Sequence, residues 1–309
     1  MSSALDTSTA RTTTAQAPRQ GRCTVAAIHR GAPFHWVGDG FRVSNFFPNH
    51  QLTAERVSPF LLMDYHPPYE YPALARGQRG VGWHPHRGFE TVTLAWEGSV
   101  AHHDNAGHAG VIGPGDAQWM TAASGILHQE HHEEAFSRRG GRFHMMQLWV
   151  NLPRKDKMAP PAYQPITAAE IPVVSLADGA GTVRVVAGEH QGVRGPARTF
   201  TPITMLDARL TAGGGLSTAI PAGHNALVIV LSGSVRAEGK RAGVRELVLF
   251  ANDGDGIEVI AEEDAHVLVL AGEPIPEPIV QHGPFVMNTE AEIHQAIRDL
   301  NTGRFGELP

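Results

Sequence analysis

The sequence of 309 residues is poor in cysteine, in long apolar runs and in basic charge, and each shortage excludes a class of protein. The single cysteine, Cys23, excludes an intrachain disulfide, so we expect a small buried thiol and a cytoplasmic location. No run is long and apolar enough to span a bilayer, and residues 1–20 lack the apolar centre of a signal peptide, which argues against membrane association. The formal net charge of -6 argues against direct nucleic-acid binding, which needs a basic surface.

Long helical periodicity is also scarce, and the pattern that replaces it is typical of an all-β protein. The 34 glycines and 22 prolines separate short apolar runs such as TVTLAW, ALVIVL and HVLVLAG. Residues 1–20, rich in Ser, Thr and Ala, bury too little apolar surface to offset the entropy of ordering, and we predict a mobile tail there.

An internal repeat accounts for the length of the chain. The segment LAWEGSVAH around Gly98 matches VLSGSVRA around Gly233, and each predicts a strand, a turn and a returning strand. We therefore expect two similar β-barrels joined by the proline-rich stretch 151–172.

The C-terminal segment has the pattern of one amphipathic helix. Thr289 lies three residues before Glu292, as in a capping box, and apolar residues then repeat at helical spacing at Ile293, Ile297 and Leu300. We expect this helix to dock on a barrel.

Two short motifs supply three histidines and a carboxylate at spacings that suit a metal ion. GWHPHRGFE contains His84 and His86, and GILHQE contains His128 and Glu130. Side chains alternate faces along a strand, so the members of each pair point the same way, and two such pairs on neighbouring strands can converge on one ion. Imidazole and carboxylate ligands suit iron, manganese, cobalt, nickel, copper or zinc.

Histidine is abundant enough that some of these residues need no ligand role. With 18 histidines, pairs such as His102–His103 and His131–His132 arise without any metal, and we expect them to be solvated or hydrogen-bonded to a neighbour. Pro85 strengthens the case for the first motif, because proline disfavours helical geometry at His84 and presents both imidazoles at a strand start.

Strand parity leaves the identity of the fourth ligand open, and alignment of the two repeats limits the metal to the first copy. Glu90 lies an even number of residues from His86, so it competes with Glu130. When Gly98 is aligned with Gly233, His84 and His86 fall on Ala219 and Pro221. The single histidines of the second copy, His224 and His266, are expected to be structural. We therefore expect one metal, in the first barrel.

The chain resembles the pirin family of the cupin superfamily through five motifs in the same order. These are HPHRGFETVT from His84, PGDAQWMTA from Pro114, GILHQE from Gly125, QLWVNL from Gln147 and QHGPFVMNT from Gln281. The resemblance implies a bicupin fold of two jelly-roll-like β-barrels with a C-terminal helix. We expect a metal-binding barrel at 21–153, a second barrel without metal at 154–285, and the helix and tail at 286–309.

The resemblance also implies a ligand set and a metal. It indicates His84, His86, His128 and Glu130 as ligands of one divalent metal, with Fe²⁺ the usual assignment, and so favours Glu130 over Glu90. Candidate residues behind these ligands are Gln118, Trp119, Glu90 and His144, with core packing the stronger interpretation for Trp119. The sequence HHEEAFSRRGG that follows Glu130 departs from the family, so the rim of the pocket is not carried over.

Pirin-like proteins are similar to quercetin 2,3-dioxygenases, which implies a flavonol-like aromatic substrate and O₂. In that interpretation Glu130 is also the catalytic base that accepts the proton of the flavonol 3-hydroxyl. The alternative is a non-enzymatic, redox-sensitive regulator that acts through a protein partner, such as a transcription factor or a metabolic enzyme. The family resemblance is compatible with both functions.

Overall fold

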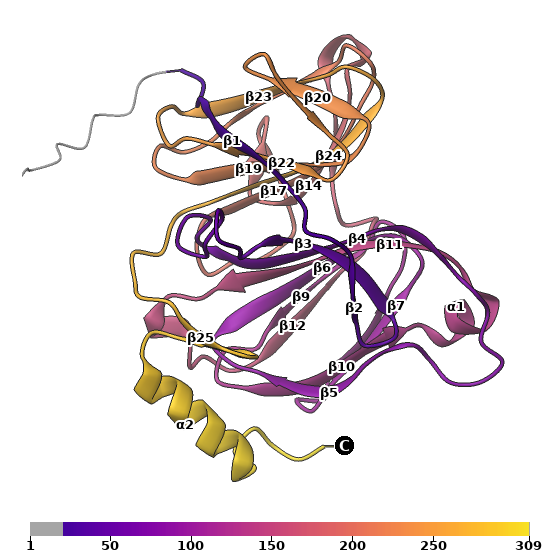
Figure 1. The fold of residues 1–309 in the computed structure, drawn as a ribbon, viewed down its shortest axis with the longest axis vertical. Helices are drawn as coiled ribbons and strands as arrows, with labels where there is room; N and C mark the ends of the chain where they lie inside the picture. The colour runs from indigo at the N-terminus through magenta and orange to yellow at the C-terminus, as the bar shows by residue number, and fades with distance from the viewer. Residues whose placement is uncertain (1–20, 309) are drawn as a thin grey trace, which may run out of the picture.

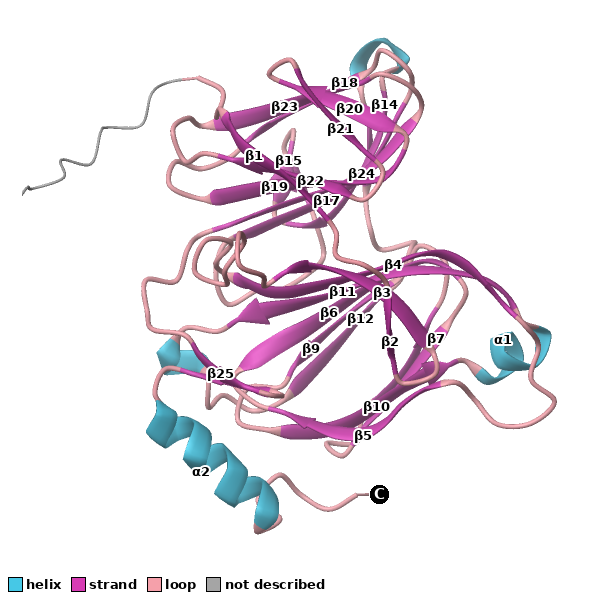
Figure 2. Ribbon diagram, in the orientation of Figure 1, coloured by secondary structure: helices cyan, strands magenta, loops and turns pink. Residues whose placement is uncertain are grey.

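Short apolar runs form strands throughout residues 21–308, the part of the chain that the computed structural model describes. The strands build two stacked barrels (Figure 1), and the only α-helices among the described residues are α1 (Glu134–Arg139) and α2 (Glu290–Asn301) (Figure 2). Short 3₁₀ turns occur at Arg154–Asp156 and Ala177–Gly179. The all-β prediction is confirmed, whereas the predicted tail, 1–20, lies outside the described residues. Neither α-helix is long and apolar enough to cross a membrane.

The first barrel pairs a large antiparallel sheet with a small one. The large sheet has the order β12 (Ala162–Ile166), β9 (Ala117–Thr121), β6 (Phe89–Glu97), β11 (Gly141–Asn151), β4 (Phe60–Tyr71), β3 (Phe41–Phe47) and β2 (His35–Val37). The small sheet has the order β5 (Gly80–His86), β10 (Ile126–His132), β7 (Val100–Asp104) and β8 (Ala109–Ile112).

The second barrel repeats this arrangement strand for strand. Its large sheet has the order β1 (Val25–Arg30), β22 (Glu246–Phe250), β19 (Asn225–Ser232), β24 (Ala265–Gly272), β17 (Ile203–Leu210), β14 (Gly181–Ala187) and β13 (Val173–Ser175). Its small sheet has the order β18 (Gly215–Ala219), β23 (Gly256–Ala261), β20 (Ser234–Ala237) and β21 (Lys240–Gly243). Two short hairpins complete the set, β15 (Glu189–His190) with β16 (Val193–Arg194) and β25 (Val280–His282) with β26 (Phe285–Met287). The repeat inferred from Gly98 and Gly233 therefore corresponds to the β6–β7 and β19–β20 turns.

The two barrels exchange their edge strands. β1 precedes the first barrel in sequence but pairs with β22, and the indigo strand runs among the orange strands in Figure 1. β12 follows the first barrel yet pairs with β9. The expected barrel ranges, 21–153 and 154–285, do not include this exchange. Ranges that are continuous in sequence cannot assign an edge strand to the other barrel.

The cores of the two barrels differ in chemistry. The largest apolar cluster lies between the two seven-stranded sheets and joins residues of both, including Trp119, Met146 and Leu268. The second barrel is filled by aliphatic side chains, and the predicted buried thiol, Cys23, belongs to that cluster. The interior of the first barrel instead contains buried histidines. Of the two barrels, the first is therefore the one that can hold a polar functional site.

Helix α2 begins with the predicted cap and packs on the first barrel. The Thr289 hydroxyl accepts a hydrogen bond from the backbone N–H of Glu292 at 3.2 Å. The apolar face of the helix, including Ile293, packs with Leu127 of β10. Arg87, which directly follows β5, forms a buried ion pair with Asp299 of α2 at 2.8 Å. The helix thus holds the turn that leads out of β5.

Candidate metal centre

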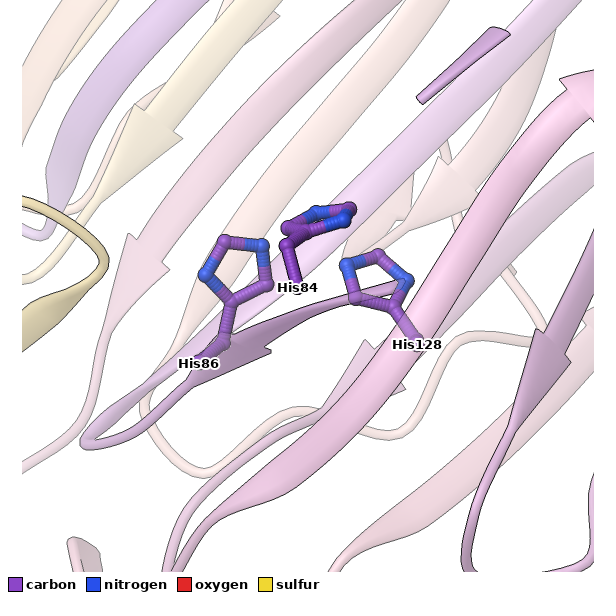
Figure 3. Close-up of side chains that lie close together, drawn as sticks. All are labelled: His84, His86 and His128. Atoms are coloured by element: carbon purple, nitrogen blue, oxygen red, sulfur yellow. The ribbon is translucent and has the colours of Figure 1, made fainter. Parts of the chain in front are cut away.

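Three histidines converge on the inner face of the small sheet of the first barrel. β5 and β10 are antiparallel neighbours, with His84 directly opposite His128. His84 and His86 alternate with Pro85 and share one face, so all three imidazoles face one another (Figure 3). Their ring centroids are 4.2 to 4.9 Å apart, and one nitrogen from each ring lies within 4.8 Å of the others.

The free nitrogens of this cluster have the chemistry of metal ligands. Nδ1 of His86 and Nε2 of His128 are buried and have no hydrogen-bond partner. Nδ1 of His84 lies 2.8 Å from the carbonyl oxygen of Gly82, which can accept a hydrogen bond from the Nδ1–H group and so leave Nε2 as a ligand atom. Burial, reinforced by the neighbouring imidazoles, lowers the pKa of His86 and of His128 well below the usual value. The rings of His86 and His128 are therefore neutral, which is the form that binds a metal.

Glu130 lies on the same strand as His128, beyond an irregularity in the β5–β10 pairing. Its side chain is nearly buried, and its Oε1 accepts a hydrogen bond from the Gln118 amide at 2.7 Å. Burial raises the pKa of the Glu130 carboxyl, although His102, His84 and the Gln118 amide oppose that rise. Glu130 forms a compact group with His128 and His102 rather than with all three clustered histidines, and His128 belongs to both groups.

His102 is the residue of this region that the sequence interpretation missed. It is fully buried opposite Glu130, and its ring stacks on Tyr163 at 4.7 Å. Its Nε2 lies 3.2 Å from Oδ2 of Asp104, and its Nδ1 lies 3.4 Å from Nδ1 of His128. Since the Asp104 carboxylate can only accept, we assign the proton of His102 to Nε2, which makes Nδ1 an acceptor for His128. This arrangement leaves Nε2 of His128 unprotonated and available as a ligand.

Glu90 lies on the opposite face of the large sheet, so it is not near the histidine cluster. The ring of Phe89 is 5.0 Å from that of His86, and Glu90, the next residue along β6, shares the face of Val92, which packs between the barrels. The parity count from His86 fails because the turn through Gly88, with φ of 90°, interrupts the alternation between β5 and β6.

The other residues that the sequence suggested as contacts of the metal ligands lie on opposite faces of the large sheet. Gln118 touches Glu130 as predicted, whereas Trp119, the next residue, packs in the core between the barrels. His144 also lies away from the cluster, since its Nε2 is 3.0 Å from the Tyr65 hydroxyl and its ring contacts Trp96. Only Gln118 of the four is placed to orient a ligand.

Among the described residues, the corresponding face of the second barrel has apolar side chains in place of the predicted ligands. The turn alignment and the strand register place four residues at the positions of the predicted ligands, namely Ala219, Pro221, Ile257 and Val259. Ile257 and Val259 are buried in the aliphatic core. His266, one of the histidines expected to be structural, is buried, and its Nε2 lies 2.5 Å from Oδ1 of Asp207. These four positions therefore carry no ligand side chains, and one metal per chain stays a prediction.

The environment of Glu90 predicts a pH-dependent cost to folding. Burial raises the pKa of Glu90 to about 7, and its Oε1 accepts a hydrogen bond from the Thr121 hydroxyl at 2.7 Å. The folded state holds the Glu90 proton more tightly than the unfolded state does. The free energy of unfolding is therefore highest below the ordinary pKa of 4.5 and falls as the pH rises through 7. Glu90→Gln keeps the acceptor but cannot ionise. Its stability relative to the wild type should rise by about 2–3 kcal/mol between pH 5 and pH 8.

Urea unfolding of both proteins at the two pH values measures this difference. Glu55→Gln, at an exposed position, is the matched control and should show no such change. An equal stability difference for Glu90→Gln at both pH values would contradict the prediction.

Comparison with known proteins agrees with the fold and with the motifs. The family model named Pirin matches residues 40–150, and that of the Pirin C-terminal cupin domain matches residues 205–306. A Pseudomonas aeruginosa protein named provisionally as a quercetin 2,3-dioxygenase is 49% identical over 281 residues, covering 91% of this chain and 98% of its own. Human pirin is 41% identical over 280 residues, covering 87% of this chain and 89% of pirin. The crystal structure of quercetin 2,3-dioxygenase from Acinetobacter baumannii, 44% identical, has a TM-score of 0.89 and covers 94% of this chain and 100% of that one. The chain therefore belongs to the pirin family.

Proposed function

We propose that this protein is a metal-dependent dioxygenase that cleaves quercetin or a related flavonol with O₂. The ligands in this proposal are His84, His86, His128 and Glu130, and the metal is one divalent ion, Fe²⁺ in the first instance. The observation that carries it is the convergence of three imidazoles beside a pocket of about 200 Å³, with a buried unpaired nitrogen on His86 and on His128. The names of the similar Pseudomonas and Acinetobacter proteins support the substrate class.

The bound metal would supply a Lewis-acidic, redox-active centre with open coordination positions. The protein's part is to hold the ligands and to move one proton. Asp104 fixes His102, and His102 fixes the tautomer and orientation of His128, an arrangement that typically raises the basicity of a ligand. The rigid β5–β10 pair sets the distance between the two sides of the cluster.

Glu130 is the proposed base for the substrate 3-hydroxyl. Its raised pKa makes it a stronger proton acceptor than an exposed glutamate, and it lines the pocket together with His84 and His86. Gln118 donates to Oε1 of Glu130, and its own amide oxygen accepts from the Tyr163 hydroxyl at 2.9 Å. This chain of hydrogen bonds restricts the carboxylate to one orientation.

The choice of the fourth ligand can be tested with two matched amide substitutions. Glu130→Gln should weaken metal retention by roughly 10- to 100-fold or more and change the spectrum of the bound metal, because an amide is a poorer, uncharged ligand. Glu90→Gln should leave both unchanged, since Glu90 faces the core between the barrels. Metal titration against a competing chelator measures the difference. The reverse ranking would move the ligand assignment to Glu90.

The dioxygenase proposal is tested on anaerobically purified protein after metal analysis. Metal-loaded protein should consume quercetin and O₂ together and release carbon monoxide. Failure of every candidate metal to support O₂ uptake with any flavonol would contradict the proposed function.

A further inference from the structure

His66 is a buried histidine at the wall of the pocket with no hydrogen bond to any described residue. The residue is 3% exposed, and its ring contacts Phe41 edge-on at 5.3 Å and Phe143 at 6.0 Å. Burial lowers the pKa of His66 to about 3, so the ring is neutral and offers one donor and one acceptor. Buried polar groups without a partner are rare in folded proteins. Nδ1 is the fully enclosed nitrogen, whereas Nε2 has no hydrogen bond to a described residue and is not fully enclosed, so a polar group that enters the pocket can reach Nε2.

The strand register places His66 further along β4 than the strand position that lies beside the metal centre. Leu62, Asp64 and His66 alternate along β4 and all line the pocket. Leu62 lies opposite Trp149, whose ring is 5.2 Å from that of His86. His66 is four residues further along a regular part of the strand, which corresponds to about 13 Å at the usual rise per residue. The pocket thus has the metal cluster at one end and His66 at the other.

The walls between these ends are largely apolar. Val43, Val81 and Met145 line the pocket together with Phe41, and Asp64 adds a carboxyl group midway along it. Burial raises the pKa of Asp64, although a hydrogen bond from the Asn45 amide opposes the rise.

We propose that His66 recognises a hydroxyl group at the end of the substrate remote from the metal. The pocket then selects elongated planar ligands with chelating oxygens at one end and a hydroxyl at the other. A flavonol hydroxylated on its outer rings has this layout, so the inference deepens the proposed function and rests on it. A site that hydrogen-bonds a substrate hydroxyl discriminates against the analogue that lacks it, because the buried partner is then left unsatisfied.

Equilibrium binding without O₂ tests this recognition separately from turnover. The probes are quercetin, which has hydroxyls on both outer rings, and 3-hydroxyflavone, which keeps only the chelating pair on the same skeleton. Metal-loaded wild-type protein should bind quercetin on the order of tenfold more tightly. His66→Phe keeps an aromatic ring beside Phe41 and Phe143 but removes both nitrogens, and should reduce the preference to less than about twofold. His66→Gln should restore part of the preference, because an amide can donate and accept.

His282→Phe is the matched control, because it makes the same replacement at an exposed histidine that does not line the pocket. It should keep the preference, and all variants should retain the metal and the wild-type melting profile. If both probes bind but the preference is absent in the wild type or survives in His66→Phe, the role of His66 is overturned while the proposed function stands. If the metal-loaded wild type binds neither probe, the flavonol function is overturned together with this inference.

Discussion

The double variant His84→Ala, His86→Ala should lose its metal, whereas the wild-type chain should bind about one ion per chain. Both imidazoles come from one strand face, and their removal leaves His128 and Glu130 beside His102. The two ring nitrogens of His102 are engaged with Asp104 and His128, so too few free ligand atoms remain to hold the ion. We expect affinity to fall by more than about 100-fold, beyond the loss typical of residues behind the ligands. Elemental analysis of protein without an affinity tag, with titration against a chelator, measures this.

A control variant should show that metal loss is specific to His84 and His86 and does not follow from the removal of any two histidines. His224→Ala, His282→Ala removes two histidines that belong to neither candidate metal group among the described residues. It should keep one metal per chain. Two tightly held metals in the wild type, or full binding after loss of His84 and His86, would contradict the single-site assignment.

The local part of the site follows from the sequence because strand alternation is a local property. His84 and His86 share a face with no information beyond their spacing and the intervening Pro85, and the spacing of His128 and Glu130 places them on one strand in the same way. The same rule fails for Glu90, because a turn separates it from His86 and alternation does not continue through a turn.

The remaining features depend on contacts between segments that are distant in sequence. His102 approaches His128 only through the register of β7 against β10, so the sequence offers no more than its two-residue spacing from Asp104 as a signal. The exchange of β1 and β12 between barrels likewise requires the pairing of edge strands across the whole chain. Overall architecture was accessible through the repeat and the family motifs, whereas the partner of each edge strand was not.

Glu130→Ala should reduce quercetin turnover far more than its loss of metal explains. A residue that only ligates the ion would lower activity in proportion to metal content. A residue that also accepts the substrate proton stabilises the transition state, and general-base assistance is typically worth ~10²- to 10⁴-fold in rate. The raised pKa of the buried Glu130 carboxyl and its fixed orientation on Gln118 favour this second role.

The measurement is the rate of quercetin loss, O₂ uptake and carbon monoxide release per bound metal, with each variant loaded to a known metal content. Gln118→Ala is the comparison variant, because it removes the hydrogen bond to Glu130 but leaves the carboxylate, and should lose less activity than Glu130→Ala. In Glu130→Ala a more alkaline pH should recover part of the rate, since a substrate that ionises in solution needs the base less. Activity that falls in strict proportion to metal content, with no recovery at alkaline pH, would leave Glu130 as a ligand alone and would require another group to take the proton of the 3-hydroxyl.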